Sequence, residues 1–262
     1  MTGTLWWFRD SWEMVRRNLI HIKRTPELLL DVTLSPIMFV LLFNFVFGGA
    51  ITVGVEGGEQ GDYINYMMSG IFVQTIAFAG IYTSVLLAND LQKGMIDRFR
   101  SLPMSQSSVL TGRTLTDVMR AALAIAIMWG VGMLVGFRPE GGLAANLAAI
   151  GLMLLFGFAL SWVGVAAGSL VRTPEALQGI IFAIVFPLTF VSSAFVPVET
   201  MPDWLQPFAQ WQPMTIVMNE VRDLTLGTDL YHTEALAVAW SVGILVVGFP
   251  LGIWLYNRRT TQ

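Results

Sequence analysis

Residues 141–171 have the sequence GGLAANLAAIGLMLLFGFALSWVGVAAGSLV, which contains no Asp, Glu, Lys or Arg over 31 positions. A bilayer core roughly 30 Å thick is crossed by about 20 apolar residues in a helix. Backbone polar groups in lipid must bond within their own segment, so this stretch predicts a transmembrane helix. It is the longest of six charge-free stretches, whose number and spacing indicate the fold.

The other five stretches have the same character. They are 24, 27, 17, 23 and 23 residues long, at 32–55, 63–89, 121–137, 176–198 and 235–257, and the helix of the third can begin earlier, near Leu110. The sequence therefore predicts an all-α integral membrane protein, with one transmembrane domain over residues 1–262 and six transmembrane helices. The predicted spans are 28–49, 63–88, 110–136, 143–170, 176–196 and 234–256.

The composition agrees with a membrane protein. Of the 262 residues, 55% are hydrophobic and only 13% are charged, and the mean hydropathy is +0.64. A soluble domain has about a quarter charged residues. The absence of cysteine excludes disulfides, thiolate metal sites and cysteine nucleophiles.

The distribution of Lys and Arg predicts the orientation, because cytoplasmic connections carry an excess of both. With the N-terminus inside, 13 of the 15 basic residues lie on one side, and the other side has only Arg138 and Arg222. The sequence therefore predicts a multi-pass membrane protein with both termini in the cytoplasm.

Residues 1–24 predict an amphipathic interface helix. Apolar residues recur at spacings of 3, 4, 3, 4 and 3 from Leu5 to Ile22, which places them on one helical face. Trp6, Trp7 and Trp12 suit the headgroup region of a cytoplasmic leaflet. A helix packed on a soluble partner is the alternative.

The connection 90–103 between the second and third spans is also amphipathic. Leu91, Met95, Phe99 and Leu102 share one stripe, charged residues face elsewhere, and Pro103 ends the pattern. The segment is either a solvated loop or a docking element for a cytoplasmic partner, and its spacing alone does not decide between them.

The long connection at 197–225 predicts short outer helices. Four prolines interrupt the chain from Val196 to Thr233, and Trp204, Leu205, Phe208 and Trp211 lie between them. Non-helical backbone in a membrane must be buried against protein, so we expect re-entrant turns packed on the fifth and sixth spans.

The tetrapeptide Arg-Thr-Pro-Glu occurs at 24–27 and again at 172–175. Thr suits the N-cap, Pro the first helical position and Glu the positive end of the helix dipole. Each copy therefore predicts the start of a span.

Several kinds of chemistry are missing from the sequence. It contains no phosphate-binding G-x-x-x-x-G-K-[ST] motif, no H-E-x-x-H and no catalytic constellation. The span centres hold only neutral polar residues, such as Gln74 and Tyr82, which argues against a proton-coupled carrier. The pairs Gly132/Gly136 and Gly164/Gly168 have the G-x-x-x-G spacing and predict close packing of the third and fourth spans.

Two blocks of sequence resemble a known family. The first is Asp90–Ser105, DLQKGMIDRFRSLPMS, followed by Gly112-Arg113 and Asp117, and the second is the outer stretch FVPVETMPDWLQP from Phe195, followed by Pro213-Met-Thr and Arg222. Both resemble the permeases of ABC-2-type exporters, most closely the daunorubicin/doxorubicin-resistance permeases. The resemblance covers nearly the whole chain, although many relatives have Glu at or near Gln92. That departure leaves open whether Asp90 or Asp97 makes the docking contact.

The resemblance implies the ABC-2, or type V exporter-like, fold and a set of partners. These are a second permease chain (a homodimer or a sister permease), two ATP-binding cassette ATPase subunits, membrane lipids and a hydrophobic small-molecule substrate, with no nucleic acid. ATP and Mg would bind the ATPases, and this chain would bind no cofactor and no metal.

The resemblance also implies roles for residues. Segment 90–103 would be the coupling helix, seated on the ATPase through Asp90, Leu91, Gln92, Lys93, Gly94, Met95, Asp97, Arg98, Arg100, Leu102 and Pro103. The first, second and fifth spans would line the path, with candidate residues Phe39, Phe43, Gln74, Phe78, Tyr82, Phe182, Phe186 and Phe190. An aromatic lining suits a hydrophobic or amphipathic substrate, whereas plain packing is the alternative for each ring.

The expected function is thus the permease subunit of an ATP-driven exporter of a drug or natural product, without catalytic residues of its own. Export of a lipid or a lipid-linked glycan is an alternative. A passive channel or membrane scaffold is a second alternative, and a membrane enzyme is a third that the missing catalytic groups disfavour.

Overall fold

The computed structural model describes residues 34, 37–42, 45, 60–92, 106–171 and 173–260. The predicted interface helix 1–24 with Trp6, Trp7 and Trp12, most of span 28–49 with Phe43, and the coupling residues Lys93–Pro103 lie outside these ranges. The helices are α4 (Gln60–Gln92), α6 (Gln106–Val135), α7 (Gly142–Leu170), α8 (Pro174–Phe190), the 3-10 helix η2 (Val198–Thr200), α9 (Gln206–Trp211), α10 (Pro213–Leu226) and α11 (Glu234–Thr260). The described part of the chain contains no strand.

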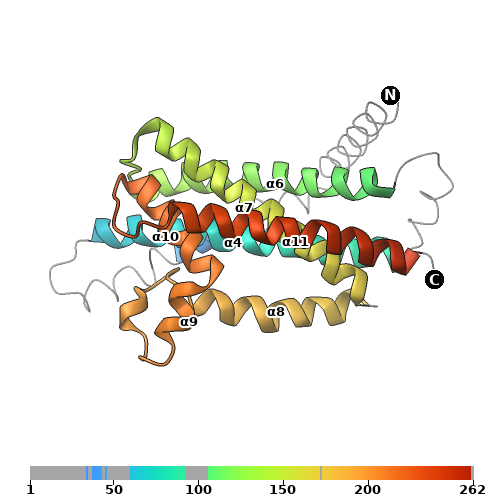
Figure 1. Cartoon of the computed structure of the whole chain (residues 1–262). Helices are drawn as coiled ribbons and strands as arrows, with labels where there is room; N and C mark the ends of the chain where they lie inside the picture. The colour runs from blue at the N-terminus through green and yellow to red at the C-terminus, as the bar shows by residue number, and fades with distance from the viewer. Residues whose placement is uncertain are drawn as a thin grey trace.

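The long helices form an elongated bundle, with the short helices gathered at one of its ends (Figure 1). Within the described residues, α4, α6, α7 and α11 are long and apolar enough to cross a membrane, and α8 is a shorter apolar helix of 17 residues. These helices confirm an all-helical membrane fold. Each reverses the direction of the one before, so α4 ends where α6 begins, near the end of α11 (Figure 1).

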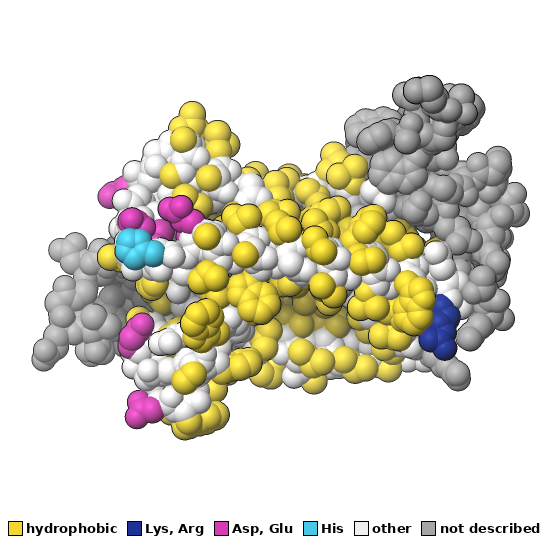
Figure 2. All heavy atoms as spheres, viewed as in Figure 1, with side chains coloured by type: hydrophobic (Ala, Val, Ile, Leu, Met, Phe, Trp, Pro, Cys, Tyr) yellow, Lys and Arg dark blue, Asp and Glu magenta, His cyan; other side chains and the backbone are white. Residues whose placement is uncertain are grey.

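The two ends of the bundle differ in the charge of their side chains. Figure 2 shows acidic side chains and a histidine at one end, basic side chains at the other, and a broad hydrophobic surface between them. We call the end that holds Glu140, Glu199, Asp203, Asp229 and Glu234 the acidic end, and the end that holds Arg113, Arg258 and Arg259 the basic end. The hydrophobic surface between them is the part that a membrane would cover.

Helix α7 packs chiefly on α4 and α11. A Cβ atom placed on Gly164 would lie 3.0 Å from the carbonyl oxygen of Gly80, and one on Gly168 would lie 2.7 Å from that of Ser84. The backbones of α7 and α4 therefore touch. The prediction that Gly164 and Gly168 pack against the third span was wrong, because both glycines face α4, which is the second span.

The other predicted glycine pair also faces α4. A Cβ atom on Gly132 of α6 would lie 2.5 Å from Met68 Cε of α4, and Gly136 ends α6 with a φ of +121°. Nearby, Phe72 stacks on Trp129 with ring centroids 5.2 Å apart, and Phe137 meets both rings edge-on. Helix α6 is thus held to α4 by large side chains where the glycine leaves room for them.

Helix α8 begins as the second Arg-Thr-Pro-Glu copy predicts. Thr173 is the N-cap, its hydroxyl oxygen accepts from the Ala176 N–H at 3.4 Å, Pro174 opens the helix and Glu175 lies in the first turn. The helix ends at Phe190, six residues before the predicted end of the span at 196, and the chain continues as a buried turn. The run of uncharged residues continues past this break, so charge alone did not indicate it.

The prolines of the outer connection produce short helices, as predicted. Pro197 precedes η2, Pro207 lies in the first turn of α9 and Pro213 begins α10. Helix α10 packs on α11, which confirms the predicted contact with the sixth span, and it also packs on α4 and α7. Its central residues are buried, and Gly227 ends it in the left-handed region with a φ of +68°.

Candidate functional site

Two polar contacts join α4 and α6 toward the basic end, and we call the four residues that make them the α4–α6 clamp. Arg113 Nη1 donates to Asp90 Oδ2 at 2.5 Å, forming an ion pair. Thr83 Oγ1 donates to Asp117 Oδ2 at 2.6 Å. Both contacts join residues on either side of the 93–105 connection, so they tie together the two helices that this connection links.

The Thr83–Asp117 contact is buried, and the Asp90–Arg113 pair is partly buried. The hydrogen bond of the Asp90–Arg113 ion pair is stronger than a neutral one, and burial protects the Thr83–Asp117 hydrogen bond from water. Arg120 adds a longer contact, with its Nη1 4.0 Å from Asp117 Oδ1. The clamp therefore has a buried part deeper in the bundle and an ion pair nearer the connection.

Three of the predicted coupling residues are described, and they end α4. Asp90, Leu91 and Gln92 form its last turn, with Gln92 exposed. Asp90 faces Arg113 in this structure, so its carboxylate is already engaged within the chain.

The predicted path residues fall into two groups. On α8, Phe182, Phe186 and Phe190 form a row with ring centroids 4.7 and 4.6 Å apart, and Phe195 continues it at 5.4 Å. All three helical rings are exposed, Phe182 by 59%. Elsewhere, Gln74 is buried, Phe78 is half-buried, and Phe39 and Tyr82 are exposed. The row on α8 is a continuous aromatic surface, and its role as a substrate path stays a prediction.

A buried arginine organises the acidic end. Arg222 is only 2% exposed, and its guanidinium donates to the Ser193 carbonyl oxygen at 2.8 Å, Asn219 Oδ1 at 2.7 Å and the Tyr66 carbonyl oxygen at 3.2 Å. Its Cζ also lies 3.6 Å from the centroid of the Tyr66 ring. We call Tyr66, Ser193, Asn219 and Arg222 the Arg222 cluster; it joins α10 to α4 and to the turn after α8.

The same region closes the end of α8. Gln212 Nε2 donates to the Leu188 carbonyl oxygen at 3.1 Å and to that of Val191, and Ser193 Oγ donates to Asn219 Oδ1 at 2.7 Å. The last carbonyl groups of a helix have no partner within it. Side chains of the outer connection supply those partners, so the early end of α8 is a formed structural feature.

Comparison with known proteins gives the family. A model of the ABC-2 type transporter family matches residues 9–226. The chain belongs to the ABC-2 type transporter family. It is 35% identical over 246 residues to a daunorubicin resistance ABC transporter permease protein of Streptomyces coeruleorubidus, covering 94% of this chain and 85% of the relative. A doxorubicin resistance ABC transporter permease protein of Mycobacterium tuberculosis is 25% identical over 237 residues, with 89% and 81% covered.

The ABC-2 family match gives the geometry its context. The chain is the membrane permease subunit of an ABC exporter, as the sequence resemblance predicted. The family match includes the α4–α6 clamp and the Arg222 cluster, since both lie between residues 66 and 222. Within the described residues, no group of three or more His, Asp or Glu side chains could hold a metal ion.

Sequence reasoning missed how these ABC-2 residues pair. The position of Asp117 in the sequence indicated no partner on α4. Arg222 was noted as one of two basic residues on the outer side and as part of a resembling block, but without a partner. The signal that could have pointed to it is the Asn219/Arg222 pair at i,i+3, which places an amide and a guanidinium on one helical face.

Glu220 of the permease makes the stability of the acidic end depend on pH. Burial raises the pKa of Glu220 above its ordinary value of 4.5, nearby Glu234, Asp223 and Asp229 raise the pKa further, and the hydrogen bond from Thr233 opposes the shift. A raised pKa favours the protonated folded form, so stability is full below about pH 4.5 and falls as the pH rises through the folded-state pKa.

Replacing Glu220 with glutamine is therefore expected to flatten this dependence. The unfolding temperature in detergent, followed from pH 4.5 upward, should fall less steeply for Glu220→Gln than for the wild type, because glutamine stays neutral. Asp203→Asn, at an exposed carboxylate of the same end, should keep the wild-type slope. Parallel profiles for Glu220→Gln and the wild type would contradict the assignment.

Proposed function

We propose that this permease moves a hydrophobic or amphipathic drug or natural product out across the bacterial cytoplasmic membrane, driven by two separate ATPase subunits. The names of the relatives, which refer to daunorubicin and doxorubicin resistance, support this class of substrate. The exposed phenylalanine row on α8 also supports it, since aromatic surfaces suit flat apolar molecules.

The observation that carries the proposal is the α4–α6 clamp. It joins the helices on both sides of the connection that we propose as the coupling helix, residues 90–103. A force on that connection then reaches both helices, because the ion pair and the buried hydrogen bond resist their separation. ATP binding by the partner subunits would shift the permease between states by differential contact with this segment.

The clamp also helps to identify which aspartate contacts the ATPase. Asp90 is paired with Arg113, and separating the pair would leave the guanidinium without this partner. We therefore propose that Asp97 contacts the ATPase and that Asp90 transmits the resulting motion to α6.

The remaining elements of the proposal concern topology and assembly. The separation of basic and acidic ends supports six spans with both termini in the cytoplasm, since basic residues concentrate on that side. A second permease chain would complete the path against the exposed face of α8. Residues 1–24 would lie in the cytoplasmic interface, and 197–225 would form the outer re-entrant helices.

Reversing one charge of the clamp should reduce transport. With the ATPase present in inside-out vesicles, Arg113→Glu is expected to lower ATP-driven daunorubicin accumulation by about tenfold, the change that about 1.4 kcal/mol of lost coupling gives. The reciprocal double variant Asp90→Arg, Arg113→Glu restores the opposite charges and should recover most of the transport.

The control for this test lies at the same end of the bundle. Arg258→Glu changes an exposed arginine of α11 that is not in the clamp and should keep near-normal transport. Wild-type transport by Arg113→Glu, or failure of the double variant to recover while all variants insert equally, would overturn the coupling role. Absence of ATP-driven accumulation by the wild type would instead overturn the substrate class.

A further inference from the structure

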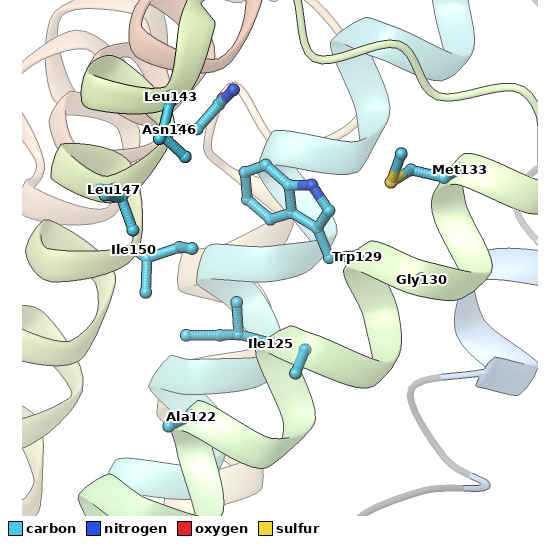
Figure 3. A pocket seen from close by; sticks show the side chains of 10 residues that line it. Ala122, Ile125, Trp129, Gly130, Met133, Leu143, Asn146, Leu147 and Ile150 are labelled. Atoms are coloured by element: carbon cyan, nitrogen blue, oxygen red, sulfur yellow. The ribbon is translucent and has the colours of Figure 1, made fainter.

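An apolar groove of about 490 Å³ lies between α6 and α7, away from the clamp and from the phenylalanine row. Its α6 side runs from Ala122 to Met133, and its α7 side from Leu143 to Ile150. Figure 3 shows Trp129 projecting from α6 toward Asn146 and Leu147 of α7. The lining is otherwise aliphatic.

The groove opens on the outside of the bundle. A Cβ atom placed on Gly130 would meet nothing within 4 Å, so this part of α6 faces empty space. Met133, Leu143 and Leu147 are exposed along its rim. In a membrane this opening faces lipid, because it lies between the C-terminal part of α6 and the first turns of α7, two helices long enough to span.

The length of the groove matches one lipid leaflet. Eleven residues separate Ala122 from Met133, and at 1.5 Å per residue the α6 side is about 16 Å long. Half of a bilayer core is about 15 Å thick. The groove therefore accommodates an acyl chain from one leaflet, and its Met133 end is the end nearer the acidic end of the bundle.

The side-chain amide of Asn146 lies at that end. Asn146 Oδ1 is buried and has no hydrogen-bond partner among the described residues. An unpaired amide oxygen in an apolar site is costly, so a hydroxyl donor would stabilise it. The neutral amide provides specificity without a buried charge.

A cation stands just beyond the groove. The guanidinium of Arg138 donates from Nη1 to the carbonyl oxygen of Met133 at 2.9 Å and to that of Phe137 at 3.1 Å, and Met133 lines the groove. Of the described arginines at the acidic end, Arg222 is buried, which leaves Arg138 as the exposed one among acidic neighbours. No described carboxylate forms an ion pair with it.

We propose that this groove binds one acyl chain of an anionic phospholipid, with the headgroup phosphate at Arg138 and a headgroup hydroxyl at Asn146. The occupant follows from the leaflet-long apolar channel, the cation at its polar end and the unpaired amide oxygen. Phosphatidylglycerol has both the phosphate and the hydroxyl groups, so it is the probe.

The test is lipid retention by the full chain, purified in detergent and incubated with dioleoyl phosphatidylglycerol or dioleoyl phosphatidylcholine, with bound lipid counted by native mass spectrometry. The wild type should retain phosphatidylglycerol preferentially. Arg138→Gln should bind phosphatidylglycerol about tenfold more weakly and lose the preference, since the phosphate loses its charged partner. Gly130→Leu fills the groove and should lower retention of both lipids.

The matched control is Gly243→Leu on α11, another exposed glycine where a Cβ atom would meet nothing within 4 Å, and it should retain lipid as the wild type does. Retention of phosphatidylglycerol at the wild-type level by both Arg138→Gln and Gly130→Leu would overturn the proposal. Binding of glycerol phosphate alone with equal strength would show an anion site without an acyl chain and would overturn it as well.

A second measurement avoids groove-filling changes. Phosphatidylglycerol with brominated acyl chains, at low mole fraction in phosphatidylcholine, should quench tryptophan fluorescence, and Trp129→Phe should remove a large part of that quenching. Trp204→Phe, at an exposed tryptophan of the outer turns, should remove less. Equal quenching of the wild type and Trp129→Phe would overturn the proposal.

Discussion

Replacing the buried Gly70 with alanine is expected to lower the unfolding temperature of the purified permease far more than a glycine-to-alanine change on an exposed helix face. A Cβ atom on Gly70 would lie 2.1 Å from the Ala194 carbonyl oxygen and 2.7 Å from the Ala194 Cα. Both are backbone atoms of the turn after α8, so no side chain can rotate away. Forcing extra atoms into a packed site costs about 1–3 kcal/mol, and a backbone clash lies at the upper end or beyond.

Gly243 provides the control for Gly70. A Cβ atom there meets nothing within 4 Å, and alanine is favoured over glycine in a helix by about 1 kcal/mol. Gly243→Ala should therefore unfold at the wild-type temperature or higher, measured by tryptophan fluorescence during heating in detergent. Equal unfolding temperatures for the two variants would mean that the turn does not lie against α4.

Replacing Arg222 with methionine should have the second large effect. The change leaves the Ser193 and Tyr66 carbonyl oxygens and the Asn219 amide oxygen without their guanidinium donor inside the protein. Leaving a buried acceptor unsatisfied typically costs about 1–3 kcal/mol, and Arg222 donates to three acceptors. We expect most of the Arg222→Met protein to elute as aggregate in size-exclusion chromatography, and the remainder to unfold at a lower temperature.

The stabilities of two other variants provide the comparison for Arg222→Met. Arg222→Lys keeps the charge but not the forked geometry, so its stability should fall between those of methionine and the wild type. Arg258→Met removes an exposed arginine and should cost about 0.5 kcal/mol or less. If Arg222→Met and Arg258→Met were equally stable, the cluster would contribute little to the fold.

The spans were predictable because lipid imposes a length and an absence of charge. The four helices α4, α6, α7 and α11 lie where charge-free stretches predict them, and Thr173-Pro174-Glu175 marks the start of α8 by local chemistry alone. The short outer helices follow from prolines, which fix where helices can begin.

The end of α8 was not predictable from charge, although Pro187 lies in its last turn. Residues 191–196 are as free of charge as the helix before them, and the break depends on Gln212 and Arg222, which lie 21 or more residues further along the chain. The clamp shows the same limit, since Thr83 and Asp117 meet only after α4 and α6 have paired. The glycine pair of α7 indicated close packing correctly but could not identify the neighbour.

The contact of α7 with α4 also limits how the exporter can change shape. Where Gly164 and Gly168 meet Gly80 and Ser84, turning α7 about its own axis would drive a side chain such as Val165 into the opposing main chain. Backbone atoms have no alternative rotamers, so this interface cannot adjust to a relative movement of the two helices. The transport cycle must therefore place its sliding surfaces elsewhere, on faces such as that of α8 where flexible side chains can exchange neighbours.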